Sequence, residues 1–176
     1  KGSLVSPDKL RFDISHNKPI SHSDLNIIEI EINNKIRENF IIKTTVMNIQ
    51  KARKIGALAL FGEKYGEEVR VVKMGENDDQ HYSVELCGGT HVNRSGDIGV
   101  FKILSESALG SGVRRIEAVA GQAALAEYQA ENKIINELAS ELKTSKEALK
   151  ERIISLILDR KNLEKKIIDL NKKINT

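Results

Sequence analysis

The sequence has a single cysteine, Cys87, among its 176 residues, so no disulfide can form within the chain. This excludes a cross-linked secreted scaffold and favours a reducing compartment. The chain also lacks a run of about 18 apolar residues that could span a membrane, and it lacks the apolar region of a signal peptide. We therefore expect a cytoplasmic protein with no membrane partner. Since position 1 is Lys rather than Met, we expect a piece of a longer protein.

A strong excess of one charge sign is absent as well. The 28 Lys and Arg residues against 25 Asp and Glu residues give a net charge of +3, which excludes a polybasic protein but permits nucleic-acid binding. A basic group in the middle of the chain could follow a nucleic-acid backbone while its aromatic rings stack on bases, although a solvated surface is the default. Its members are Lys51, Arg53, Lys54, Lys64, Arg70 and Lys73, with Phe61 and Tyr65 among them.

Glycine and proline are absent after Gly121, which divides the chain into residues 1–121 and 122–176. The first part alternates strand-like runs with glycine turns, and the second consists of helix formers. We predict an α+β fold for the first part, with a mostly antiparallel sheet or small barrel and flanking helices. Helices are expected over 25–36, capped by Ser21 or Ser23, and over 50–57. Strands are expected over 40–49, 69–72, 82–86, 98–104 and 113–119.

The second part is predicted to be a long helical hairpin or a coiled-coil-like extension. Apolar residues recur every seven positions and form a stripe along the helix. A second apolar row of the same heptad pattern is interrupted by Lys146 and Arg160. Thr144 to Glu147 form a capping box, which predicts a break there, with one unbroken helix as the alternative. The apolar stripe needs a partner to cover it. The partner could be the other helix of the hairpin, a second copy of the chain or a neighbouring domain. The main positions of the stripe are Ile135, Leu142, Leu149, Leu156, Leu163 and Leu170.

The segment Cys87-Gly88-Gly89-Thr90-His91 is the most informative for chemistry. It places a thiolate and an imidazole four residues apart on a glycine turn after an apolar strand, and both groups suit zinc. Zinc needs about four ligands, or three and a water, whereas only two are evident here. Packing of a lone cysteine is the simpler explanation. A nucleophile pair of Cys87 and His91, oriented by Asp97, is a weaker alternative.

Two adjacent arginines follow the turn at Gly110 to Gly112. In a strand Arg114 and Arg115 face opposite ways, so at most one of them points into a shared cleft. That arginine could pair with a phosphate or with a ribose-linked oxygen. A surface arginine beside Glu117 is the alternative.

Three spaced motifs, over 84–92, 96–99 and 112–118, together resemble the editing domain of alanyl-tRNA synthetases. The segments 1–5, 10–13 and 57–66 are similar to the same family in the same order. The resemblance covers residues 1 to about 121, and the helical tail resembles the family's linker to its C-terminal domain. Threonyl-tRNA synthetases share a related domain, but Gly88-Gly89-Thr90 is similar to the alanyl type.

The resemblance implies hydrolysis of serine or glycine wrongly attached to alanine tRNA, within an enzyme that ligates alanine to that tRNA with ATP and Mg²⁺. It implies a zinc site made of a His-x-x-x-His pair and a Cys-x-x-x-His pair. Cys87 and His91 match the second pair, and the sequence contains no His-x-x-x-His. Half of the site is therefore expected here, and the isolated chain is expected to be inactive.

The resemblance also places Gly88, Gly89 and Thr90, with Arg114 or Arg115, against the substrate or the tRNA end. Two other functions remain open at this stage. One is a catalytically incomplete module that binds tRNA and associates through its helices, with a homodimer formed through the tail or an exposed apolar surface. The other is a free-standing trans-editing deacylase, which the lack of the histidine pair and the long tail disfavour.

Overall fold

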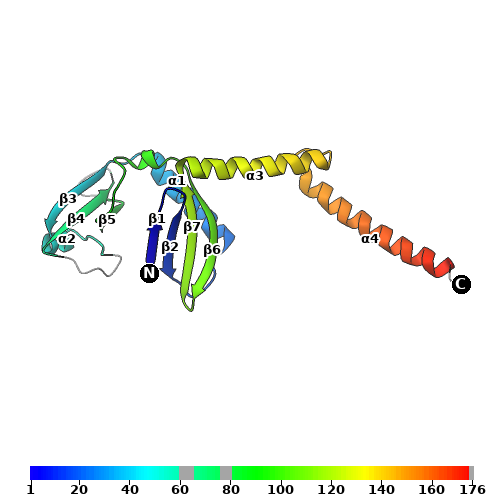
Figure 1. Ribbon diagram of the computed structural model, residues 1–176, viewed down its shortest axis with the longest axis horizontal. Helices are drawn as coiled ribbons and strands as arrows, with labels where there is room; N and C mark the ends of the chain where they lie inside the picture. The colour runs from blue at the N-terminus through cyan, green and yellow to red at the C-terminus, as the bar shows by residue number, and fades with distance from the viewer. Residues whose placement is uncertain (60–65, 76–80, 175–176) are drawn as a thin grey trace. The chain divides into compact units, whose positions relative to one another are not determined.

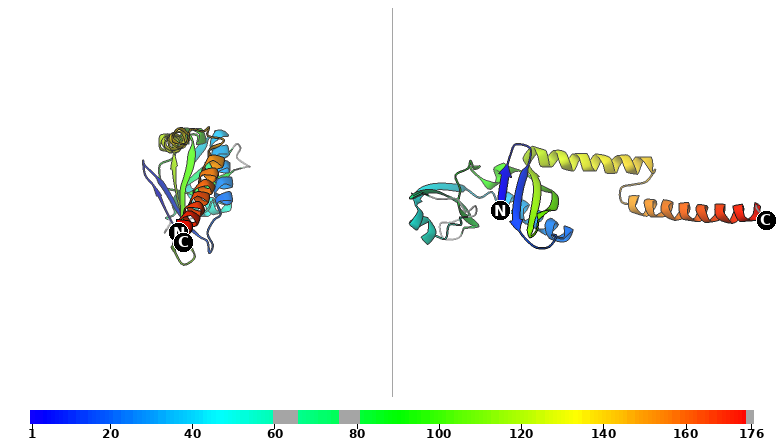
Figure 2. Two further views of the ribbon diagram at one scale, coloured as in Figure 1. Left: turned by 90° about the vertical axis from the view of Figure 1, so that its right-hand side faces the viewer. Right: turned by 60° about the horizontal axis from the view of Figure 1, so that its bottom comes forward.

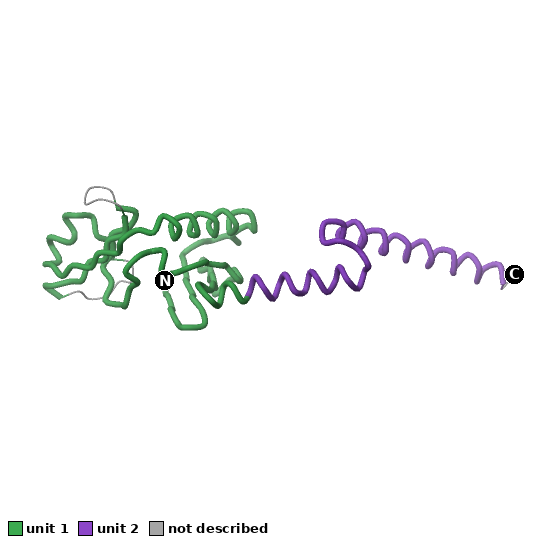
Figure 3. The backbone as a smooth tube through the Cα atoms, turned by 90° about the horizontal axis from the view of Figure 1, so that it is seen from above, with its two compact units in different colours: residues 1–126 green, residues 127–176 purple. Residues whose placement is uncertain are grey.

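The computed structural model describes residues 1–59, 66–75 and 81–174. These form two compact units, Lys1–Ala126 and Glu127–Thr176 (Figure 3). The first unit is α+β and the second is helical. The predicted fold class is confirmed, in the form of two antiparallel sheets in the first unit (Figure 1).

The larger sheet has four antiparallel strands in the order β1-β2-β7-β6. These are β1 Gly2–Val5, β2 Leu10–Ser15, β6 Phe101–Gly110 and β7 Val113–Ala120. The sequence patterns did not predict β1 and β2. β2 pairs with β7 about a hundred residues away, with Asp13 opposite Arg115, so nothing in the local pattern shows that partner.

Helix α1, His22–Arg37, lies behind this sheet in the view of Figure 1 and beside it in Figure 2. Ser21 caps it by accepting the amide of Asp24, as one of the two expected caps. The helix also protects the edge strand β6, because the Asn33 side chain exchanges two hydrogen bonds with the backbone of Phe101 (2.8 and 2.9 Å). A Glu29 carboxylate oxygen accepts the amide of Ile103 (2.6 Å).

The smaller sheet has the order β3-β4-β5, with β3 Ile42–Asn48, β4 Glu68–Met74 and β5 Ser83–Leu86. Helix α2, Ile49–Lys54, packs on one face of it. The buried core there consists of Ala52, Val69, Val71 and Leu86. Since side chains alternate along a strand, Arg70, Glu85 and Cys87 belong to the opposite face.

A 3-10 turn, Ser95–Ile98, precedes β6, so the strand expected from residue 98 begins three residues later. The buried Ser95 hydroxyl accepts the amide of Phe40 (2.8 Å) and donates to the carbonyl of Lys35 (3.0 Å). Gly99 and Gly121 approach closely, since a Cβ on Gly99 would lie 3.3 Å from the Gly121 Cα. Both residues have positive φ, which glycine adopts without strain.

The tail consists of α3, Gly121–Glu141, and α4, Leu149–Ile174, so the predicted break is confirmed. Lys143, two residues after the end of α3, has a positive φ of 49°. The amides of Lys143 and Thr144 bond to the carbonyls of Ser140 and Ala139 at 3.0 Å, which is a Schellman motif without glycine.

The residue that caps the next helix differs from the expected one. Ser145, not Thr144, accepts the amide of Ala148 (3.4 Å), and its neighbour Glu147 has a lowered pKa because its carboxylate accepts a backbone hydrogen bond and one from Ser145. The expected cap was therefore one residue early.

Helix α4 has no buried residue among those described, so its apolar stripe is uncovered. Leu156 is 37% exposed, and Leu163 and Leu170 are 58% and 57% exposed. No described helix is long and apolar enough to cross a membrane.

Candidate functional site

The turn that carries Cys87 and His91 begins directly after β5, at the end of the small sheet. The Cys87 amide donates to the carbonyl of Arg70 on β4 (3.2 Å), which extends the β4-β5 pairing by one residue. The Arg70 guanidinium Nη1 donates to the carbonyl of Gly89 (2.7 Å) and, at 3.3 Å, to that of Gly88. One residue of β4 therefore contacts the turn through both its main chain and its side chain.

His91 presents a buried nitrogen with no partner. Its Nε2 atom is inaccessible to solvent and makes no hydrogen bond with the described residues. Burial lowers the pKa of the imidazole below its usual 6.5, the charge of Arg70 lowers it further, and Glu85 acts in the opposite direction. The ring is therefore neutral at pH 7, which is the form that ligates metals.

His91 also lines a cavity of about 420 Å³ in the first unit. The β1-β2 turn forms one side of the cavity, Thr90, His91 and Val92 form another, and Ile98 and Gly121 contribute to the wall. Cys87 is half-buried with a free thiol and is not among the lining residues. The participation of residues 5–10 had no signal in the sequence patterns, since their strands were not predicted.

The chemistry of the two donors fits zinc, but their number does not complete a site. A neutral imidazole with an unpartnered buried nitrogen and a free thiol are both zinc ligands. Within residues 1–59, 66–75 and 81–174, no group of three or more His, Cys, Asp and Glu side chains is placed to hold a metal ion. The described residues could supply two ligands of four.

Arg114 and Arg115 face opposite sides of β7, as expected, and each is engaged by a carboxylate. Arg115 forms a two-pronged pair with Asp13 (2.8 and 2.9 Å). Arg114 pairs with Glu106 on β6 through Nε and through Nη2 (2.6 Å). Sequence reasoning missed both carboxylates, because pairing across a sheet is not visible in a local pattern.

These two pairs predict acid sensitivity. The Arg115 hydrogen bonds hold the pKa of Asp13 below its usual 3.8, and those of Arg114 hold the pKa of Glu106 below its usual 4.5, against the opposing effect of burial. A carboxylate with a lowered folded pKa contributes stability above its unfolded pKa, and this is lost as pH falls through the folded pKa. We expect the free energy of unfolding to fall as pH drops below about 4.5.

Urea unfolding between about pH 6 and pH 2 measures this dependence. Asp13→Asn should flatten it, because only one of the two carboxylates remains. Asp8→Asn, on the exposed β1-β2 turn, is the matched control and should keep the wild-type slope. Equal slopes in both variants would contradict the prediction.

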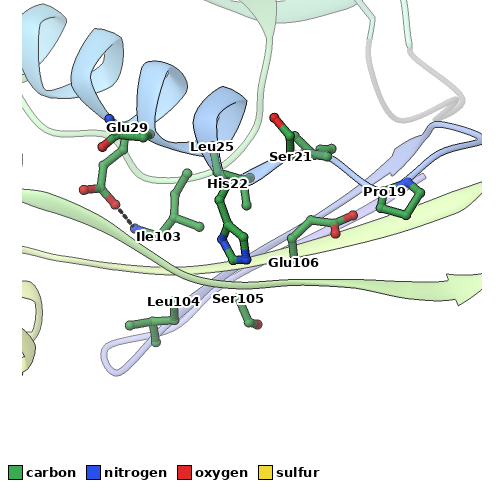
Figure 4. Close-up of a pocket in the computed structure, with 11 residues that line it drawn as sticks. Pro19, Ser21, His22, Leu25, Glu29, Ile103, Leu104, Ser105 and Glu106 are labelled. Atoms are coloured by element: carbon green, nitrogen blue, oxygen red, sulfur yellow. Dashed lines mark hydrogen bonds between the residues drawn. The ribbon is translucent and has the colours of Figure 1, made fainter. Parts of the chain in front are cut away.

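The other histidines are placed elsewhere. His22 points into a cavity of about 470 Å³ between the start of α1 and β6, near Glu106 and Ser105 (Figure 4). The backbone amide of His16 donates to the carbonyl of Gly112 (3.0 Å). The proposed orienting residue Asp97 accepts the amide of Arg94 (2.9 Å), which caps the 3-10 turn.

The basic group is only partly described. Lys51, Arg53 and Lys54 are exposed in the last turn of α2. Arg70 contacts the Cys87–His91 turn instead of belonging to an open basic surface. Lys64, Phe61 and Tyr65 lie outside the described residues.

Comparison with known proteins gives the class. Residues 69–117, from β4 into β7, match the threonyl and alanyl tRNA synthetase second additional domain. The matched segment contains the Cys87–His91 turn and both arginines.

Comparison over the whole length indicates the alanyl type. The chain is 51% identical over 99% of its length to an alanine–tRNA ligase of Parvibaculum lavamentivorans. It is 48% identical over 99% to that of Clostridioides difficile and 50% identical over 95% to that of Rickettsia felis. It spans about one fifth of these curated relatives, namely 20%, 19% and 18%. The predicted resemblance to alanyl-tRNA synthetases is confirmed, and the chain corresponds to a segment of such a ligase.

Proposed function

We propose that residues 1–121 form part of an editing site that hydrolyses serine or glycine esters wrongly attached to alanine tRNA. The observation that carries this proposal is the buried Nε2 of His91, which has no hydrogen-bond partner among the described residues. His91 also lines a cavity, and the chain is about 50% identical to alanine–tRNA ligases. The parent enzyme would ligate alanine to its tRNA in the cytoplasm with ATP and Mg²⁺.

We propose that Cys87 and His91 hold a zinc ion together with groups from outside the described residues. When bound, zinc would polarise a water or position the ester. The chain's own residues would form the turn and the pocket. Gly88 and Gly89 allow the turn to bend, and His91 is held neutral by its burial.

We propose that Thr90, which lines the cavity, and one of the two arginines, Arg114 or Arg115, recognise the tRNA end. Each guanidinium has five N–H donors, and each carboxylate pair uses two of them. The remaining donors of that arginine would contact phosphate or ribose oxygens, while its carboxylate partner keeps the guanidinium in place. Alanine tRNA is therefore the proposed partner.

The second candidate is a tRNA-binding module that associates through its helices without catalysis. It is favoured by the uncovered apolar stripe of α4, for which a second copy of the chain is the proposed partner.

Zinc titration of the chain, with a chromophoric chelator as competitor, tests the metal role. We expect binding that weakens at least about tenfold in Cys87→Ala and in His91→Ala, since each removes a ligand. His22→Ala, an exposed histidine, is the control and should bind as the wild type does. Equal binding by all four proteins would remove the metal role. Salt-sensitive binding of alanine tRNA without zinc uptake would favour the second candidate.

A further inference from the structure

The Arg70 side chain crosses from β4 to the turn that follows β5. Its Nη1 atom donates to two consecutive carbonyls, those of Gly89 (2.7 Å) and Gly88 (3.3 Å). The carbonyl of Arg70 accepts the Cys87 amide (3.2 Å). Arg70 therefore contacts the amide of Cys87 through its main chain and the two residues after Cys87 through its side chain.

Among the residues that the structure describes, little else holds the turn. Gly88 and Gly89 are exposed and have no side chains to pack, and a Cβ added to Gly88 would meet no described atom within 4 Å. Two consecutive glycines also lose the most conformational entropy on ordering. An ordered turn here therefore depends on hydrogen bonds to its backbone.

The strand that carries Arg70 is held in the core of the small sheet, which makes Arg70 a suitable anchor for the turn. Its neighbours Val69 and Val71 are buried in the core under α2, at 6% and 0% exposure. The side chain of Arg70 is on the opposite face, which it shares with Cys87. Both hydrogen bonds come from one nitrogen, Nη1, whose N–H groups are fixed in the plane of the guanidinium, whereas a lysine ammonium rotates on a flexible stem.

We infer that Arg70 is a positioning residue that orders the Gly88-Gly89 backbone and thereby sets the relative placement of Cys87 and His91. The inference rests on the proposed function only for its consequence in zinc binding. The ordering of the turn is a property of the chain itself. Groups that orient metal ligands typically change metal affinity by about 10- to 100-fold when they are removed.

The experiment uses the full chain and compares Arg70→Ala and Arg70→Lys with the wild type. Lys73→Ala is the matched control, because it removes a cation from the same strand at a position whose register partners are Lys43 and Val84. The first readout is the backbone ¹⁵N order parameters of Gly88 and Gly89 without metal. We expect them to fall from about 0.85 to below about 0.6 in Arg70→Ala and to stay unchanged in Lys73→Ala.

The second readout is the zinc dissociation constant. We expect it to rise about tenfold or more in Arg70→Ala. Arg70→Lys keeps the charge, so an intermediate loss in both readouts would support the role of the guanidinium geometry, and full recovery would assign the effect to charge and overturn the positioning role. Unchanged order parameters of Gly88 and Gly89 in Arg70→Ala would also overturn it.

Failure of the proposed zinc site can be distinguished from failure of the positioning role of Arg70. If the wild type and Cys87→Ala both fail to bind zinc, the metal role is lost, and the order parameters still decide the role of Arg70. If Arg70→Ala loses its far-ultraviolet circular dichroism signal, Arg70→Lys carries the comparison, since it keeps the aliphatic stem and the charge.

Discussion

Replacing His91 by alanine in a complete ligase that contains this segment is expected to slow hydrolysis of serine from alanine tRNA by about 100-fold or more. This exceeds the loss of about 10- to 100-fold that follows from removing a group that only orients a ligand, because His91 is itself the proposed ligand. The rate of alanine attachment should stay within about twofold, since that activity lies outside the proposed editing role.

Folding should survive the His91→Ala change. The Nε2 atom of His91 is buried and makes no hydrogen bond to the part of the chain that the structure describes, so its removal eliminates an unsatisfied polar group rather than a stabilising contact. Deacylation of seryl-tRNA and alanine charging, measured on the same preparation, separate the two activities. His22→Ala, in the cavity of Figure 4, is the control and should edit normally. Wild-type editing by the His91→Ala enzyme would contradict the proposed site.

Replacing Leu86 by alanine is expected to lower the free energy of unfolding by about 2–5 kcal/mol. Leu86 is 4% exposed and packs with Ala52, Val69 and Val71 in the core of the small sheet. The change removes apolar contacts and leaves a cavity that the β-sheet framework cannot close completely. Because Leu86 directly precedes Cys87, the loss should also loosen the turn.

Leu58→Ala is the matched control for this prediction. Leu58 is 55% exposed, and its backbone bonds to those of Leu86 and Val84 do not depend on its side chain. A surface substitution of this kind should change stability by less than about 0.5 kcal/mol. Urea unfolding of the three proteins measures the difference. Similar destabilisation by both substitutions would show that Leu86 does not belong to a closed core.

The proposed site depends on segments that lie far apart in the sequence of the first unit. The turn after β5 supplies His91, and the β1-β2 turn lines the same cavity. β2 is held against β7, where Asp13 and Arg115 form their two-pronged pair across the sheet. Acid that breaks this pair should therefore weaken the sheet that supports one side of the cavity.

The sequence by itself determined the local structure and the chemistry available to it. Helical spacing placed α1, and the lack of glycine and proline after Gly121 placed the tail. The helix break between α3 and α4 was likewise visible in a capping pattern, although the cap is one residue later. The spacing of Cys87 and His91 indicated two metal donors. Each of these signals lies within a few neighbouring residues, where propensity and side-chain periodicity operate.

Only the tertiary structure decided which partners these residues have. The strands form two sheets, the larger of which includes β1 and β2, and Asp13 pairs with Arg115, which is 102 positions away in the sequence. Arg70, which the sequence places in a basic group, donates a hydrogen bond to the carbonyl of Gly89 in the structure. The Nε2 atom of His91 is buried, and His91 lines a cavity. Strand pairing and burial depend on residues distant in the chain, so a local pattern indicates the donors and the charges but not the groups that face them.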